Sequence, residues 1–202
     1  MRRLRKSQIL RWRKRKEGFA MKQLAKEAIK GNEDAFVQLI QENTQGMYKV
    51  ARSILKNEED IADALQDTIV ACYESVGKLK KPQYFKTWLT RILINKCNDI
   101  IRSQKKEWVG EVYAEDVGST SDMEHLEFIQ MLQGLDEKYR LIIILYYVQE
   151  FRVKDIADLL HMNCATVKTR LARGRKALEQ MYGVDKKEIK HTENAMLFKM
   201  RT

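Results

Sequence analysis

The sequence predicts an all-α protein made of two small helical domains. Helix-forming residues are abundant, and only one of the 202 residues is proline and nine are glycine, a composition that favours helices over sheets or low-complexity chain. Apolar residues make up 44% of the chain and charged residues 33%, which is sufficient for a packed core. The longest apolar run, Leu141 to Val148, is far shorter than the roughly 18 to 20 residues that cross a bilayer. We therefore do not expect a membrane protein.

Apolar residues recur at helical spacing through residues 21–106, the first expected domain. One stripe contains Ile61, Leu65, Ile69, Cys72 and Tyr73, and another contains Phe85, Trp88, Leu89, Ile92 and Leu93. Residues three and four apart lie on one face of a helix, so each stripe is expected to be buried and the charged residues between them to face outward. Asn32 and Asn57 are residues that can cap the helices following them.

The charge of the N-terminal residues and the pattern of cysteines indicate the cellular compartment. Residues 1–20 carry nine basic side chains and one acid, so they hold +8 of the formal net charge of +10. They lack the apolar stretch and cleavage site of a secretory signal, and we expect a cytoplasmic protein. The three cysteines, Cys72, Cys97 and Cys164, are odd in number and widely spaced. This pattern favours buried, reduced thiols over disulfides or a metal site.

An acidic segment separates the two expected domains. Between Glu107 and Glu127 there are seven acids and no lysine or arginine, and the segment is interrupted by Gly118-Ser119-Thr120-Ser121. This pattern predicts a linker over 107–122. A second helical domain is expected over 123–183, where Gly183 can stop the last helix, followed by a polar tail over 184–202.

The segment from Phe151 to Leu178 has the pattern of a helix-turn-helix. A short helix with Ala157 on its inner face is followed by a break at His161-Met162-Asn163 and by a second helix that begins at Cys164 and buries Val167. Seven basic and two acidic residues lie between Arg152 and Leu178. Such a unit binds DNA by placing its second helix in the major groove. A helical hairpin with a solvated basic face is the alternative.

In the DNA-binding interpretation, small residues at the start of the second helix face base edges and basic residues contact phosphates. We expect only modest base discrimination because the early residues are small and weakly polar. The candidate DNA contacts are Arg152, Lys154, Cys164, Ala165, Thr166, Lys168, Thr169, Arg170, Arg173, Arg175 and Lys176.

Two sets of motifs resemble the RNA polymerase sigma factors of bacteria. The resemblance to region 4 is carried by Leu135-Asp136-Glu137-Lys138-Tyr139-Arg140, by Phe151 to Ala157 and by Thr166 to Leu178. Asp63 to Thr68 resembles region 2.2, and Phe85 to Ile92 with Asn95, Asp99 and Arg102 resembles regions 2.3 and 2.4. The motifs stand in the family's order over about residues 21–182, and the short linker is similar to that of the extracytoplasmic-function (ECF) type.

The resemblance implies a non-enzymatic protein that binds core RNA polymerase, recognises the −35 and −10 promoter elements and promotes promoter melting, without a cofactor. It assigns region 4, with the candidate DNA contacts above, to the −35 element. It also implies an anti-sigma protein, often membrane-bound in this family, as a further partner. The residues expected to bind core polymerase are Asp60, Asp63, Gln66 and Asp67. Those expected to bind the −10 element are Lys78, Lys80, Lys81, Lys86, Arg91, Asn95, Lys96 and Arg102.

The same residues also fit other interpretations. The acidic residues could be a solvated face that benefits from the helix dipole, and Trp88 at helical spacing favours a core position over a stacking platform for bases. The rival function is a transcription regulator that binds operators through the helix-turn-helix while residues 21–106 sense a signal. A small nuclease fits less well because the three histidines lie in separate segments and no metal-ligand cluster is evident.

The sequence departs from the family at a few positions. His161 stands where many relatives have glycine, Cys164 where they often have serine or proline, and Ala64 replaces a bulkier apolar residue. ECF proteins usually begin close to the position of Met21, and Lys16-Glu17-Gly18 can be encoded by a ribosome-binding-site-like AAGGAGG. Residues 1–20 are therefore either untranslated leader read as protein or a basic arm that adds nonspecific DNA affinity.

Overall fold

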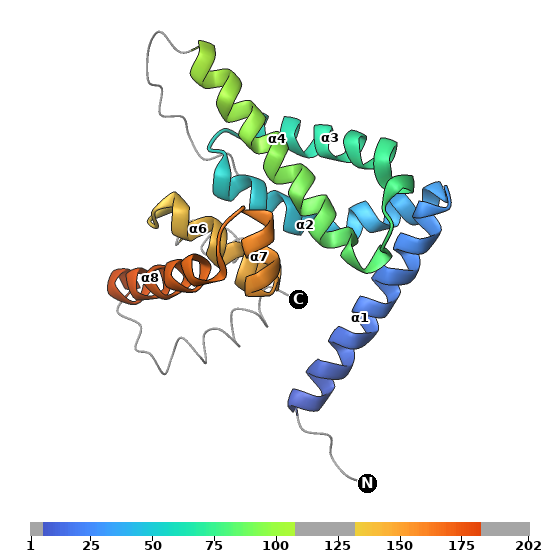
Figure 1. Cartoon of the computed structure of the whole chain (residues 1–202), viewed down its shortest axis with the longest axis horizontal. Coiled ribbons are helices and arrows are strands. Elements are labelled where there is room, and N and C mark those ends of the chain that lie inside the picture. The colour runs from blue at the N-terminus through green and yellow to red at the C-terminus, as the bar shows by residue number, and fades with distance from the viewer. Residues whose placement is uncertain (1–5, 108–131, 183–202) are drawn as a thin grey trace.

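The structure, a computed structural model, describes the backbone of residues 6–107 and 132–182 and the side chains of 18–104 and 132–182 (Figure 1). The expected linker over 107–122, the start of the second domain at 123 and the tail over 184–202 fall almost wholly outside the described residues. Within the described ranges the chain is helical, as predicted. Its helices are α1 (Lys6–Ile29), α2 (Glu33–Ile54), α3 (Glu58–Ser75), α4 (Phe85–Glu107), α6 (Glu137–Ile143), α7 (Val153–Leu159) and α8 (Cys164–Tyr182), joined in places by the short helical segments η1 (Val76–Lys78), η2 (Pro82–Tyr84) and η3 (Ile144–Val148).

Side-chain caps define where several of these helices begin. Asn32 accepts a hydrogen bond from the backbone N–H of Ala35, and Asn57 accepts one from that of Glu59, so both predicted caps are confirmed. Two further caps were not predicted: Asp136 begins α6, and the Asn163 side chain accepts the Thr166 N–H at 2.7 Å at the start of α8. A capping side chain satisfies an N–H that has no partner within the helix.

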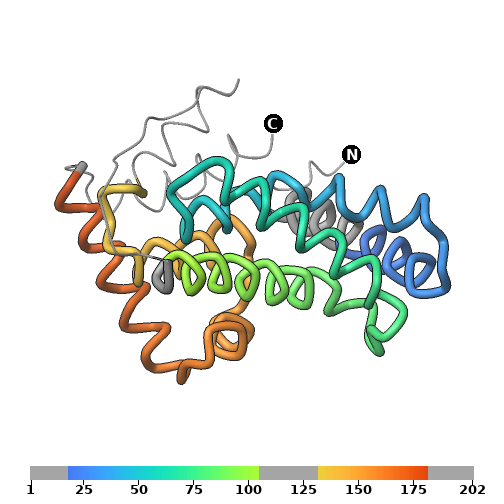
Figure 2. Tube along the Cα trace, turned by 90° about the horizontal axis from the view of Figure 1, so that it is seen from above, coloured from blue at the N-terminus to red at the C-terminus, as the bar shows by residue number. Residues whose placement is uncertain are grey.

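The first unit packs α1, α3 and α4 around α2 (Figures 1 and 2). Its fully buried side chains include Leu39 from α2, Ile61 from α3 and Leu89 and Leu93 from α4, which confirms the predicted apolar stripes. Tyr73 does not follow its stripe. It is 53% exposed, although its ring packs edge-on against that of the buried Phe36 on α2, with centroids 5.4 Å apart.

The second unit contains the helix-turn-helix. Ala157 is buried where α7 meets α8, and Val167 is buried between the same helices, as the sequence predicts. Helix α8 also crosses α6 closely at Gly174. A Cβ atom there would lie 2.7 Å from Ile143 Cδ1 and 3.2 Å from Tyr139 Cβ. Only glycine allows this close approach without displacing neighbours in a packed interior.

The turn between α7 and α8 explains one departure from the family. His161 has a φ of +51°, in the left-handed region that favours glycine. The backbone N–H of Met162 donates to the carbonyl of Ala157 at 2.9 Å, which is the bond that closes a helix C-terminus when the residue before it is left-handed. Histidine therefore holds a glycine conformation in this turn.

The thiols differ in their surroundings. Cys72 and Cys97 are buried, and burial raises the pKa of each thiol to about 12. Cys164 is exposed, so the expectation of three buried thiols is wrong for this residue. Cys164 is the first residue of α8 and directly follows the exposed turn between α7 and α8, so its side chain faces solvent.

No helix within 6–107 or 132–182 combines the length and apolar character needed to cross a membrane.

We predict that the native protein has one reactive thiol. Cys164 should react with a thiol reagent at neutral pH, whereas Cys72 and Cys97 should react only after denaturation, because the thiolate is the reactive form and their raised pKa and burial suppress it. Counting modified thiols by mass spectrometry before and after unfolding tests this. Modification of Cys72 in the native protein would contradict the described core.

We also predict that His161→Gly stabilises the protein. Glycine adopts the left-handed conformation of this turn without steric cost, and we expect a gain of about 0.5 to 1 kcal/mol in the free energy of unfolding. His161→Ala is the matched control, since it removes the imidazole and keeps the Cβ. It should give no gain in urea or thermal unfolding. Equal effects of the two variants would show that the imidazole, not the backbone, decides stability here.

Candidate functional site

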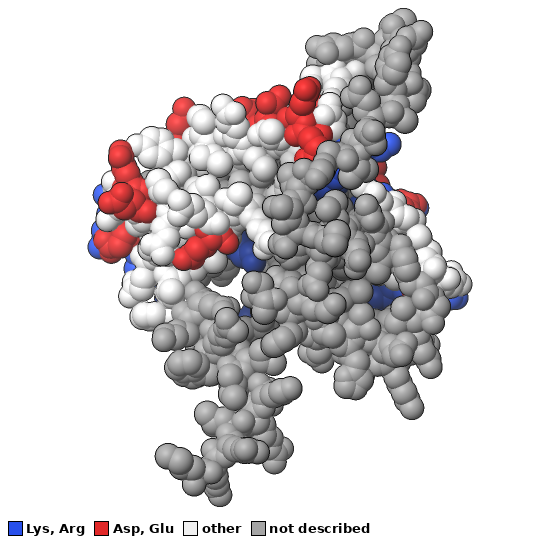
Figure 3. All heavy atoms as spheres, turned by 180° about the vertical axis from the view of Figure 1, so that it is seen from behind, with Lys and Arg blue, Asp and Glu red and all other residues white. Residues whose placement is uncertain are grey.

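The acidic residues predicted on α3 lie on one outward side of that helix. Asp63, Gln66 and Asp67 are exposed and Asp60 is half-buried. Two of the four have partners on α4: Gln104 Nε2 donates to Asp60 Oδ2 at 2.8 Å, and Lys96 Nζ lies 3.3 Å from Asp67 Oδ2. Figure 3 shows acidic side chains gathered along the edge of the molecule where Figure 1 places α3. The outward side of α3 is therefore an acidic surface that includes the exposed Asp63 and Gln66.

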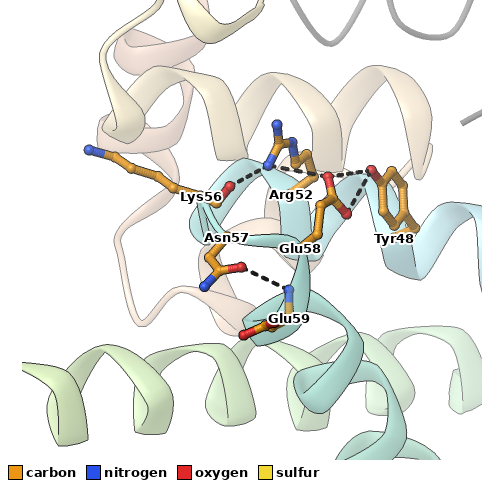
Figure 4. A network of polar contacts seen from close by, with 6 residues as sticks. All are labelled: Tyr48, Arg52, Lys56, Asn57, Glu58 and Glu59. Atoms are coloured by element: carbon orange, nitrogen blue, oxygen red, sulfur yellow. Dashed lines mark hydrogen bonds and ion pairs between the residues drawn. The ribbon is translucent and has the colours of Figure 1, made fainter. Parts of the chain in front are cut away.

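A polar network fixes the start of α3 and hence the direction of this surface (Figure 4). Tyr48 Oη donates to Glu58 at 3.1 Å, and the Arg52 guanidinium lies 3.4 Å from the same carboxylate while also donating to the Lys56 carbonyl. Burial, followed by the Glu58 charge, raises the pKa of Tyr48. The network joins the end of α2 to the first turn of α3, because Tyr48 and Arg52 belong to α2 and Glu58 to α3.

Sequence reasoning missed the apolar continuation of the acidic surface. Val70 is 52% exposed and lies one turn beyond Asp67 and Gln66 on the same side of α3. Tyr73 follows it, and the Tyr73 hydroxyl donates to Glu33 Oε1 of α2 at 2.8 Å. Val37 of α2 is also exposed. The spacing of residues 63, 66, 67, 70 and 73 was a signal that could have identified this wider surface.

The residues expected at the −10 element fall into two groups. Lys78, Lys80 and Lys81 are exposed in and after η1, and Arg91 and Asn95 are exposed one turn apart on α4. The remaining three already have partners. Arg102 pairs with Asp99, Lys96 pairs with Asp67, and Lys86 Nζ donates to the backbone carbonyl of Gln149 at 3.0 Å.

Aromatic side chains near these residues differ in exposure. Phe85 is buried, and Trp88 is partly buried against the core, with ring centroids 5.8 Å apart. The core position favoured for Trp88 therefore agrees with the structure. Tyr84 is 50% exposed, with Lys81 Nζ 6.0 Å from its ring centroid. Of these three rings, that of Tyr84 is the most exposed. Asn98, exposed one turn beyond Asn95, is an additional polar group that the sequence analysis did not single out.

The basic residues of the helix-turn-helix lie mainly on its outer side. Those exposed are Arg152, Lys154, Cys164, Ala165, Lys168, Thr169, Arg173 and Lys176, and those half-buried are Thr166, Arg170 and Arg175. Arg175 Nε donates to the Leu171 carbonyl at 3.3 Å and the Thr169 hydroxyl to the Ala165 carbonyl at 2.9 Å. These two side chains bond to their own helix, whereas Lys168 and Arg173 are exposed on it.

Helix α8 packs against α6, and polar contacts fix the start of α6. The Arg140 side chain donates to the carbonyls of Leu132, Gln133 and Leu135 at 2.9 to 3.0 Å, closing the turn that precedes α6. The Lys138 ammonium lowers the pKa of Asp136, the cap of that helix. The side chains described here include no cluster of three or more histidines, cysteines or acids that could hold a metal ion.

Comparisons with known proteins match both units. The model of sigma-70 region 2 matches residues 39–107, and that of sigma-70 region 4 matches residues 125–178. The RNA polymerase sigma factor SigV of Bacillus subtilis is 32% identical over 145 residues, covering 70% of this chain and 87% of the relative. The ECF RNA polymerase sigma factor SigW of the same organism is 28% identical over 178 residues, covering 79% and 95%.

The fold is also similar to a solved structure of CnrH in complex with the cytosolic domain of CnrY. That similarity has a TM-score of 0.60 and 27% identity, and covers 82% of this chain and 99% of the other. Because sigma regions match both units in the family's order, the regulator with a sensing first domain is not favoured. The chain belongs to the sigma-70 family as a sigma factor of the ECF type, whose activity is promoter recognition together with RNA polymerase.

Proposed function

We propose that this sigma factor divides its work among three surfaces, each carried by a different helix. The acidic surface of α3, comprising Asp60, Asp63, Gln66 and Asp67, binds a basic surface of core RNA polymerase. Its exposed carboxylates supply the charge, and Val70 and Tyr73 beside them supply apolar area that a protein partner can bury. This combination favours a protein partner over a merely solvated face.

The second surface binds the −10 element. Arg91 and Asn95 on α4 contact the strand directly, and Lys78, Lys80 and Lys81 hold its phosphates, because all five side chains are exposed. Lys96 and Arg102 can join them by exchanging a carboxylate partner for a phosphate. Tyr84 offers an exposed ring on which an unpaired base can stack. We assign this surface to a domain over residues 21–106.

The third surface binds the −35 element through α8, in a domain over 123–183 reached by the linker 107–122. The exposed side of α8 presents Lys168, Arg173 and Lys176 for phosphates, and Ala165 and Thr166 at its start for base edges. The Asn163 cap holds the first turn of the helix in place. Of the remaining assigned residues, Thr169 and Arg175 bond to their own helix and position the contacts rather than make most of them.

The protein works by binding alone, without a catalysed reaction of its own, in the cytoplasm where promoter DNA and polymerase are found. An anti-sigma protein is a further partner of the same surfaces. The similar structure of CnrH, solved with the cytosolic domain of CnrY, supports a regulator of this kind. The observation that carries the whole proposal is the separation of an acidic α3 from a basic α8 within one chain matched by both sigma regions.

We predict that Asp63→Asn weakens binding to core polymerase about fivefold, the effect of losing about 1 kcal/mol from a screened charge pair. Asp63 is suited to this test because it is exposed and has no ion pair within the described part of the chain. Titration of core polymerase with labelled protein measures the affinity. Glu27→Gln on α1 is the control, since it removes one exposed negative charge elsewhere and should leave the affinity unchanged. Full affinity of Asp63→Asn would rule out this surface.

We predict that Arg173→Gln weakens binding of the full chain to a duplex with a −35 element and lowers the slope of log affinity against log salt by about 1. The exposed guanidinium neutralises one phosphate, so the loss of affinity should be similar for all DNA sequences. Lys56→Gln, which removes an exposed charge between α2 and α3, is the matched control. Fluorescence anisotropy at several salt concentrations gives both slopes. An unchanged slope for Arg173→Gln would exclude the phosphate contact.

A further inference from the structure

Helix α1 packs on the first unit through its second half and extends from the unit in its first half. Ala25 and Ala28 are buried in the core, whereas residues 18–20 ahead of them are all exposed, with 62% of Phe19 accessible. The backbone continues as one helix back to Lys6. Figure 1 shows this end of α1 extending away from α2, α3 and α4.

The extending part of α1, residues 6–20, is strongly basic, and we call it the basic arm. Six of its residues are lysine or arginine and one, Glu17, is acidic. At 1.5 Å per residue the arm is only about 20 Å long, so its positive charge is concentrated. Like charges four residues apart, such as Arg11 and Arg15, destabilise a helix. A polyanion at the arm removes this repulsion, which makes the arm suited to an anionic partner.

The arm belongs to the unit that carries the proposed −10 surface. Helix α1 contacts η1 and η2, and a Cβ atom added at Gly77 of η1 would lie 3.9 Å from the Ile29 carbonyl oxygen at the end of α1. These two short segments hold or flank the exposed Lys78, Lys80 and Lys81. The arm is thus attached directly to the elements that carry the −10 surface.

The sequence of the arm favours DNA over a membrane surface as the anionic partner. A helix that lies on a bilayer needs a continuous apolar side. Ile9, Trp12 and Phe19 recur at helical spacing, but Lys16 stands at the position between them in that series. An α-helix in the major groove of DNA has a phosphate backbone on either side of it. Basic residues on several sides of the arm can therefore each contact a phosphate.

We propose that the basic arm is an additional, sequence-independent DNA contact, which binds the phosphates of duplex DNA beside the −10 surface. Only the place of this contact rests on the function proposed above, because the attraction to a duplex follows from the charge of the arm. Phosphate contacts add affinity that is similar for all sequences and falls steeply with salt. The arm thus strengthens the promoter complex without changing which promoter is chosen.

Neutralising three lysines of the arm tests this contact in the full chain. Glutamine is close to lysine in helix propensity, so α1 should stay folded, which circular dichroism checks. Three exposed lysines outside the arm provide a matched control that loses the same total charge. The arm variant is Lys6→Gln with Lys14→Gln and Lys16→Gln, and the control variant is Lys26→Gln with Lys30→Gln and Lys56→Gln.

Fluorescence anisotropy with a duplex of unrelated sequence, at several salt concentrations, measures the contact in the free protein. The slope of log affinity against log salt should fall by about 2 to 3 in the arm variant, since each lost phosphate contact removes about 0.9. The control variant should lower the slope by less than about 1. An unchanged slope in the arm variant would overturn the proposal. An equal fall in both variants would also overturn it, because total charge would then explain the binding.

Two other results would reject the arm as a DNA contact. The first is sedimentation of the parent protein, but not of the arm variant, with vesicles of phosphatidylglycerol and phosphatidylcholine, while the salt slopes on DNA stay equal. That result would assign the arm to lipid. The second is an intact mass that starts at Met21 in protein purified from the cells that encode it, since that protein would have no arm.

Promoter complexes with core polymerase then test where the arm acts. Complexes of the parent protein and of the control variant should survive a higher salt concentration than those of the arm variant, and all three should start transcription at the same promoter. Equal salt resistance would exclude a contact beside the −10 surface. Failure of the parent protein to support transcription at any concentration would instead contradict the function itself. The salt slopes on unrelated DNA do not depend on that function, so the two failures are distinct.

Discussion

Burial of the apolar side of α2 is the interaction on which the rest of the structure depends. This helix contacts α1, α3 and α4 in the first unit and α6 and η3 in the second. Leu39, Val50 and Ala51 along it are completely buried. The helices that cover α2 are amphipathic. Because their apolar faces pack against α2, their charged faces must point outward. The acidic side of α3 and the polar side of α4 face solvent for this reason.

The same constraint separates opposite charges within one chain. Asp63 and Asp67 extend from α3, whereas Lys168 and Arg173 extend from α8 in the other unit. A sigma factor has to bind both a protein and a polyanion, and carboxylates beside the DNA-binding helix would weaken its attraction to phosphates. The ion pair of Asp67 with Lys96 shows where the acidic surface of α3 meets the polar surface of α4.

Much of the fold was predictable because it follows from local patterns. Residues such as Ile61, Leu89 and Val167 were predicted to be inside from helical spacing, and each is fully buried. The environments of Tyr73 and Lys86 were not predictable in this way. Tyr73 lies at the edge of its stripe, where spacing cannot say whether a neighbouring helix covers it. Lys86 bonds to a carbonyl 63 residues away, which depends on how the two units pack and not on any local pattern.

Melting of a promoter by the purified chain with core polymerase tests the central claim most directly, and permanganate reactivity of unpaired thymines measures it. The account predicts that thymines at the −10 element become reactive only when chain and core polymerase are both present, with protection of the −35 element in the same complex. Protection of an operator by the chain alone, with no melting when polymerase is added, would contradict it.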